Sequence, residues 1–178
     1  MGVATAAAIL VAVPPVAALA GLHRMLNGPG SVAAAIDSLL ATPWVWIPAL
    51  ILGIVAHELI HGLAWALAGR LPLQAIRFGM NWKALSPHAQ CTMPLPASAY
   101  RRGAAAPSLV LGLVPAIAGS LFGEGGVAAF GWLMIIGAGG DIVVLWLLRK
   151  LPGHVRVEDH PTRAGCVAVN EPASGNGV

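Results

Sequence analysis

The chain has 178 residues, which suits a single domain. Hydrophobic residues make up 57% of it and charged residues only 10%, whereas about 25% of a typical soluble domain is charged. These values exclude a disordered chain and an ordinary soluble globule. The isoelectric point near 9.4 does not indicate a nucleic-acid-binding domain, because the basic residues are divided between segments that flank apolar stretches.

Four apolar stretches are long enough to cross a bilayer, which takes about 20 residues. They cover residues 3–22, 44–67, 104–122 and 127–148. We therefore expect an all-α membrane protein with four transmembrane helices in one domain over residues 1–169, and a disordered polar tail over residues 170–178. The first stretch could instead be a cleaved signal peptide ending at Ala18-Leu19-Ala20, but no Lys or Arg precedes it, which favours a retained helix.

The positive charges predict the orientation. The loop 23–43 carries only Arg24 among Lys and Arg residues. The loop 69–103 and the segment after residue 148 carry the other nine, and positive loops stay on the cytoplasmic side. Both termini are thus expected in the cytoplasm, across a prokaryotic plasma membrane, where Cys91 and Cys166 would stay reduced. These nine residues are Arg70, Arg77, Lys83, Arg101, Arg102, Arg149, Lys150, Arg156 and Arg163.

The loop between the second and third spans contains an alternating pattern. Residues 76–82 alternate apolar and polar side chains, which is typical of an amphipathic strand. Residues 88–93 could return as a second strand, so we expect a small β-hairpin at the cytoplasmic membrane surface. An irregular basic loop anchored by Trp82 is the alternative. In the third span, Pro107 and Pro115 should bend the helix.

The second span contains the pattern H-E-x-x-H, formed by His57, Glu58 and His61. On a helix with 3.6 residues per turn, the two histidines lie on one face one turn apart and can hold one Zn²⁺. Glu58 lies beside them and can reach an activated water. Ionisable groups in a membrane span are costly and usually functional. The alternative is a polar patch that forms hydrogen bonds between helices.

A third metal ligand is available in the fourth span. Asp141 and Glu58 are the acidic residues within the four spans. His61 and Asp141 precede the basic cytoplasmic ends of their spans by similar distances, about 12–14 Å at 1.5 Å per residue. Gly137, Gly139 and Gly140 should let a neighbouring helix approach closely. We therefore predict a zinc site made of His57, His61, Asp141 and one water. A lone acid bonded to the backbone is the alternative for Asp141.

Other ionisable residues are weaker candidates. His88 and Cys91 could be ligands, but their surroundings place them at the membrane surface rather than at the depth of His57. Asp37 suits a helix cap or a solvated position. We expect His154 and His160 to be exposed to solvent and His23 to lie at the membrane interface.

This set of residues suits amide hydrolysis. Zinc lowers the pKa of a bound water to about 7 and polarises a carbonyl, and Glu58 can take the proton and pass it to the leaving amine. The strand 76–82 could hold an extended substrate by edge pairing. Replacement of Phe78 or Met80 by proline should then abolish cleavage and leave the zinc content intact.

The chain resembles the DUF3267 family of membrane zincin peptidases, which are related to site-2-type intramembrane proteases. The resemblance rests on 57–63, 86–91, 101–107, Gly140-Asp141, Asp159-His160-Pro161 and Gly165, and spans roughly residues 45–168. In the site-2 family the helical H-E-x-x-H and an Asp from a later span bind zinc. The resemblance thus implies that His57, His61 and Asp141 are ligands and that Glu58 is the base.

The sequence therefore favours a membrane zinc metallopeptidase, with the lipid bilayer and a peptide or transmembrane protein as partners and no nucleic acid. One alternative is a non-enzymatic membrane protein for metal binding or assembly, although a zinc holder does not need Glu58. Another is a small transporter that uses His57, Glu58 and Asp141 as a relay, but the chain has no repeated halves. His/Asp sites also accept divalent metals other than zinc.

Overall fold

The computed structural model describes residues 2–82, 86–159 and 166–169. The predictions for Lys83, His160 and Arg163, and for a disordered tail over residues 170–178, lie outside these residues. Within the described residues the chain is mostly helical, with two small antiparallel sheets at one end. The expected class is therefore confirmed for the larger part of the chain.

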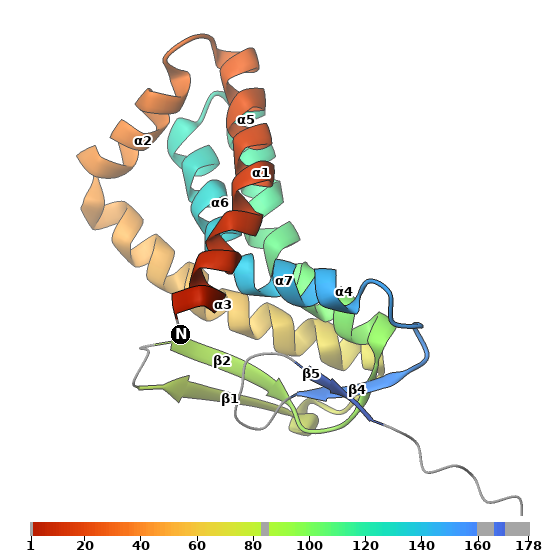
Figure 1. The fold of residues 1–178 in the computed structure, drawn as a ribbon. Coiled ribbons are helices and arrows are strands. Elements are labelled where there is room, and N and C mark those ends of the chain that lie inside the picture. The colour runs from red at the N-terminus through yellow and green to blue at the C-terminus, as the bar shows by residue number, and fades with distance from the viewer. Residues whose placement is uncertain (1, 83–85, 160–165, 170–178) are drawn as a thin grey trace, which may run out of the picture.

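Figure 1 shows α1, α5 and α6 side by side in an upright bundle, with α3 crossing below them and the strands beneath α3. A short apolar helix, α2, connects the far end of the bundle to α3 and was not predicted. The third span is one long helix in which α4 continues through a π-helical segment, η2, into α5. The bounds are α1 Gly2–Asn27, α2 Ser31–Ala41, α3 Pro43–Gly69, α4 Ala97–Pro107, η2 Ser108–Leu113, α5 Val114–Phe122, α6 Gly125–Gly137 and α7 Gly139–Leu148.

Three helices are long and apolar enough to cross a membrane: Ala6–Asn27, Pro43–Gly69 and Ala97–Phe122. They correspond to the first three predicted spans. The fourth predicted span, residues 127–148, is not one straight helix, because α6 and α7 meet at an angle of 52°. The glycines on both sides of Ala138 explain the break, since glycine has a low helix propensity. The structure thus has four candidate spans if α6 and α7 together count as one span, and three if they do not.

Small residues allow close packing in the bundle. Ala12, Ala116 and Ala128 are fully buried where α1, α5 and α6 meet. A Cβ on Gly139 would overlap the backbone of Ala8 in α1, so the predicted close approach occurs there. Gly137 and Gly140 have open space instead, so the prediction was wrong for these two glycines.

His23 is buried in the end of the bundle that lies away from the sheets. It is 2% exposed, and its Nδ1 lies 3.2 Å from Ser120 Oγ. Its ring also stands edge-on to Trp132. Its position at the membrane interface stays a prediction, and its side chain is buried between the helices. A polar side chain between apolar helices needs such a partner, because an unpaired buried group costs about 1–3 kcal/mol.

Two sheets lie at the opposite end. The predicted hairpin is present as β1 (Ile76–Asn81) and β2 (Ser86–Cys91), which pair antiparallel with Ile76 opposite Cys91. A short 3₁₀ turn, η1 (Leu73–Ala75), precedes it. A second sheet has the order β3-β4-β5 and was not predicted, because its strands are very short. Its bounds are β3 Leu95–Pro96, β4 Arg156–Asp159 and β5 Cys166–Ala168.

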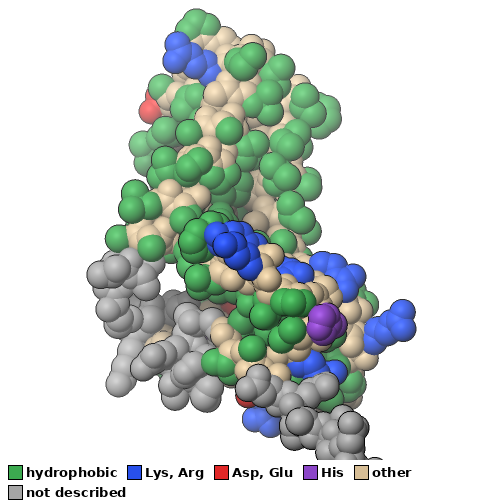
Figure 2. Space-filling model, turned by 45° about the vertical axis from the view of Figure 1, so that its right-hand side comes forward, with side chains coloured by type: hydrophobic (Ala, Val, Ile, Leu, Met, Phe, Trp, Pro, Cys, Tyr) green, Lys and Arg blue, Asp and Glu red, His purple; other side chains and the backbone are tan. Residues whose placement is uncertain are grey.

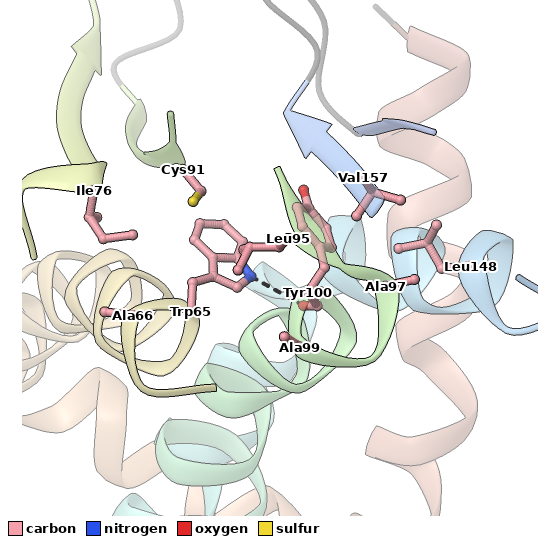
Figure 3. Packing of buried hydrophobic residues seen from close by; sticks show 10 residues of the cluster. All are labelled: Trp65, Ala66, Ile76, Cys91, Leu95, Ala97, Ala99, Tyr100, Leu148 and Val157. Atoms are coloured by element: carbon pink, nitrogen blue, oxygen red, sulfur yellow. Dashed lines mark hydrogen bonds between the residues drawn. The ribbon is translucent and has the colours of Figure 1, made fainter. Parts of the chain in front are cut away.

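The sheets share a hydrophobic core with the helix ends that lie nearest to them. Figure 3 shows Trp65 of α3 at its centre, with Tyr100 of α4 and Cys91 of β2 on either side. A Cβ on Gly62 would overlap Ile76 and Phe78, so α3 rests directly on the hairpin. This core fixes the hairpin against the helix that carries the H-E-x-x-H pattern.

The surface of the molecule changes character along its length. In Figure 2 hydrophobic side chains cover the helical bundle, and most Lys and Arg side chains in this view gather toward the end with the sheets. Large apolar side chains of the long helices are exposed, among them Leu10, Leu52 and Val114. Exposed apolar surface of this extent is compatible with a membrane protein.

Arg101 joins two of the helices. Its Nη1 donates hydrogen bonds to the carbonyls of Leu148 and Leu151, both 2.9 Å away, at the end of α7. We expect Arg101→Met to lower the free energy of unfolding by about 2 kcal/mol, the usual contribution of charge-assisted hydrogen bonds. Arg102→Met is the matched control, because Arg102 is exposed and donates a hydrogen bond to the carbonyl of Ser98 in its own helix. Denaturant titration in detergent micelles measures both, and equal losses would contradict the prediction.

Candidate metal centre

Three predicted side chains converge between α3 and α7. His57 and His61 lie one turn apart on α3, and Asp141 lies in the first turn of α7. His57 Nε2 is 3.0 Å from Asp141 Oδ2, and His61 Nε2 is 3.3 Å from Asp141 Oδ1. The two Nε2 atoms are 3.1 Å apart. Among the described residues this is the group whose ligand atoms all lie within 4.8 Å of one another and could hold a metal ion.

Gly103 of α4 orients His61. The Nδ1 of His61 lies 3.0 Å from the carbonyl oxygen of Gly103, which can only accept a hydrogen bond, so Nδ1 carries the proton. This carbonyl is available because Pro107, four residues later, has no N–H to donate in the helix. The bend at Pro107 stays a prediction, and within the helix Ala97–Phe122 this proline also leaves a backbone acceptor free. The Trp65 ring stacks on the face of the His61 ring, with ring centroids 5.2 Å apart.

The donor set fits a divalent cation. With its proton on Nδ1, neutral His61 presents the lone pair of Nε2 toward the Asp141 carboxylate. Two atoms with lone pairs repel each other unless a proton or a metal ion lies between them. Two imidazole nitrogens and one carboxylate are also a usual protein ligand set for catalytic zinc, with the fourth position left for water. His57 and His61 side chains are 11% and 6% exposed, and Asp141 is 24% exposed.

Glu58 is held beside this group by the hairpin. Its Oε2 accepts a hydrogen bond of 2.7 Å from the backbone N–H of Ala89 in β2. The Ala89 N–H thus points away from β1, so Ala89 and the residue opposite it form a pair without hydrogen bonds to each other. The facing residue, Phe78, must therefore point its own N–H to the outer edge of β1. The edge of β2 that β1 does not cover therefore faces α3 and Glu58. We call this edge the inner edge of β2.

The weaker candidates lie elsewhere. His88 is exposed and its ring lies over Gly79, on the opposite strand of the hairpin. Asp37 and His154 are exposed as well. Burial raises the pKa of the Cys91 and Cys166 thiols, so both thiols are protonated at neutral pH. Burial also raises the pKa of Asp159, although hydrogen bonds from Tyr100 and from the N–H of Cys91 oppose that rise.

Residues 50–155 match the model of the DUF3267 family, described as "Putative zincin peptidase", over more than half of the chain. The chain belongs to this family. The match lies within the interval 45–168 that the resemblance in sequence covers, and it contains His57, Glu58, His61 and Asp141. No curated protein and no solved structure matches the chain.

The structure therefore brings together all four site residues predicted from the sequence. It also shows which residues hold Glu58 and His61 in place. Ala89 and Gly103 act through backbone atoms, which no side-chain pattern reveals. Trp65 could have been found, because it follows His61 at helical spacing of four residues, where side chains are neighbours.

Pro107 offers a test of the His61 geometry. In Pro107→Ala the new N–H can donate to Gly103 and compete with His61 Nδ1, so we expect the affinity for Zn²⁺ to fall about tenfold, as for the loss of an outer hydrogen bond. Pro115→Ala is the matched control, because it restores an N–H in the same long helix away from the site. Competition with a chromophoric chelator measures both affinities. An equal affinity in the two variants would refute the role of the proline.

Proposed function

We propose that the chain is a membrane-embedded zinc metallopeptidase of the site-2 type, which hydrolyses peptide bonds of membrane-associated or transmembrane substrates. The observation that carries this proposal is the convergence of His57, His61 and Asp141 with Glu58 one residue along the same helix. A carboxylate beside the ligands has a use in hydrolysis and none in simple metal storage. Membership of the zincin peptidase family supports the same activity.

His57, His61 and Asp141 would hold the zinc, and Glu58 would act as general base. When bound, zinc supplies a Lewis acid for the scissile carbonyl and acidifies a water to a pKa of about 7. The Glu58 carboxylate takes the proton of the attacking water and gives it to the leaving amide nitrogen. Gly103 and Trp65 keep the His61 ring fixed during this step, so that its Nε2 remains available as a ligand.

An extended peptide would bind along the hairpin. The sequence-based hypothesis assigned this role to the strand 76–82. We instead propose the inner edge of β2, because Ala89 on this edge contacts Glu58, whereas the outer edge of β1 lies one strand spacing farther away, about 4.8 Å. A substrate carbonyl would accept the Ala89 N–H and release Glu58 toward the water.

The activity is tested with the purified protein and Glu58→Gln, by measuring bound zinc and the cleavage of a transmembrane peptide. We expect Glu58→Gln to retain zinc and to cleave about 10²–10⁴-fold more slowly, the usual effect of losing a general base. Asp141→Asn should lose zinc and cleavage together. A wild-type protein without zinc would eliminate every metal-based function, and a zinc-loaded protein without cleavage would favour a metal-binding or assembly role.

The peptide-binding edge is tested with two prolines. Ala89→Pro removes the N–H on the inner edge of β2, and we expect cleavage to be lost with zinc retained. Met80→Pro removes an N–H on the outer edge of β1 at an exposed position, and we expect most cleavage to remain. Peptide cleavage and zinc content are measured for both variants. Loss of cleavage in Met80→Pro alone would indicate that the substrate binds β1.

A further inference from the structure

Asp159 connects the second sheet to the hairpin and to α4. It is the last residue of β4, and its Oδ2 accepts a hydrogen bond of 2.7 Å from the backbone N–H of Cys91 in β2. Its Oδ1 accepts another of 2.7 Å from the hydroxyl of Tyr100. Both oxygens thus act as acceptors, whereas an amide of the same size has one acceptor oxygen and one NH2 group, which donates.

Cys91 and Ala89 lie two residues apart, so their N–H groups point to the same edge of β2. Asp159 holds one of these donors and Glu58 accepts from the other. The two carboxylates therefore fix the inner edge of β2 at adjacent positions. If the contact at Cys91 is lost, the neighbouring hydrogen bond on this edge is the one from Ala89 to Glu58, the residue that must move a proton.

The contact of Asp159 with Tyr100 connects it, through Trp65, to the predicted metal ligand His61. Tyr100, whose hydroxyl bonds Asp159, accepts a hydrogen bond of 3.1 Å at its own carbonyl from Trp65 Nε1. Figure 3 shows this bond. It also shows that Tyr100 lies close to Val157, which precedes Asp159 by two residues in β4. Trp65 in turn stacks on His61. Asp159 thus bonds one neighbour of each support: Cys91, two residues from Ala89 in β2, and Tyr100, which bonds Trp65.

We propose that Asp159 is a positioning residue that sets the inner edge of β2 against Glu58, and so controls peptide cleavage from outside the metal site. This inference rests on the proposed peptidase function. The role of Asp159 is inferred from its contacts with Cys91 of β2 and Tyr100 of α4.

The test compares Asp159→Asn, Asp159→Glu and the control Glu158→Gln, an exposed neighbour on the same strand. Three quantities are measured on the full chain in micelles: bound zinc, hydrogen exchange of residues 86–91, and kcat/KM for a transmembrane peptide. We expect Asp159→Asn to keep its zinc, to exchange about tenfold faster in β2, and to lose about 100-fold in kcat/KM, the effect of moving a catalytic group by about 1 Å.

The order of the variants separates positioning from packing. Asp159→Glu keeps the carboxylate and should recover most of the cleavage, whereas a packing role would favour the isosteric Asn. The proposal is overturned if Asn is tolerated better than Glu, if β2 exchanges as in Glu158→Gln, or if faster exchange leaves cleavage unchanged. Tyr100→Phe, which keeps the ring, should change exchange in the same direction if Asp159→Asn does not fold. If the wild type cleaves no peptide, the proposed function fails, and hydrogen exchange still decides whether Asp159 fixes β2.

Discussion

The rest of the structure depends on the approach of three electron-rich groups between the apolar helices α3 and α7. The Nε2 atoms of His57 and His61 and the carboxylate of Asp141 come from two helices and face one another. Such an arrangement is stable only with a cation between them or with a proton on one imidazole. Each ring must also be held at its other nitrogen or face, which explains the contacts of Gly103 and Trp65 with His61.

The helices and the strands contribute different things to this site. A regular helix uses its own N–H and C=O groups, so it can offer side chains but almost no backbone partners. The site obtains backbone partners where that regularity ends. Pro107 leaves the carbonyl of Gly103 free within a helix, and β2 offers the N–H of Ala89 along an edge that β1 does not cover. A proline and a small hairpin thus complete a centre that helices alone would leave unsupported.

Much of this could be predicted from the sequence, because it depends on side-chain type and spacing. The spacing of His57 and His61 fixed their common face, and the rarity of acids in apolar spans pointed to Asp141. The contact between Glu58 and Ala89 could not be predicted, because every residue except proline has the same N–H. Helix α2 was missed in a loop read only for its charge. The sheet β3-β4-β5 was missed because strands of two to four residues have no measurable alternation.

The break at Ala138 has a consequence for the charge of the site. A straight fourth span would place Asp141 in the middle of a helix, where each N–H is paired with a carbonyl of the preceding turn and leaves no net partial charge. Since α7 begins at Gly139, Asp141 lies instead in its first turn, where unpaired N–H groups carry the equivalent of about half a positive charge. The interrupted helix therefore stabilises the anionic ligand by itself, in surroundings that offer little water to do so.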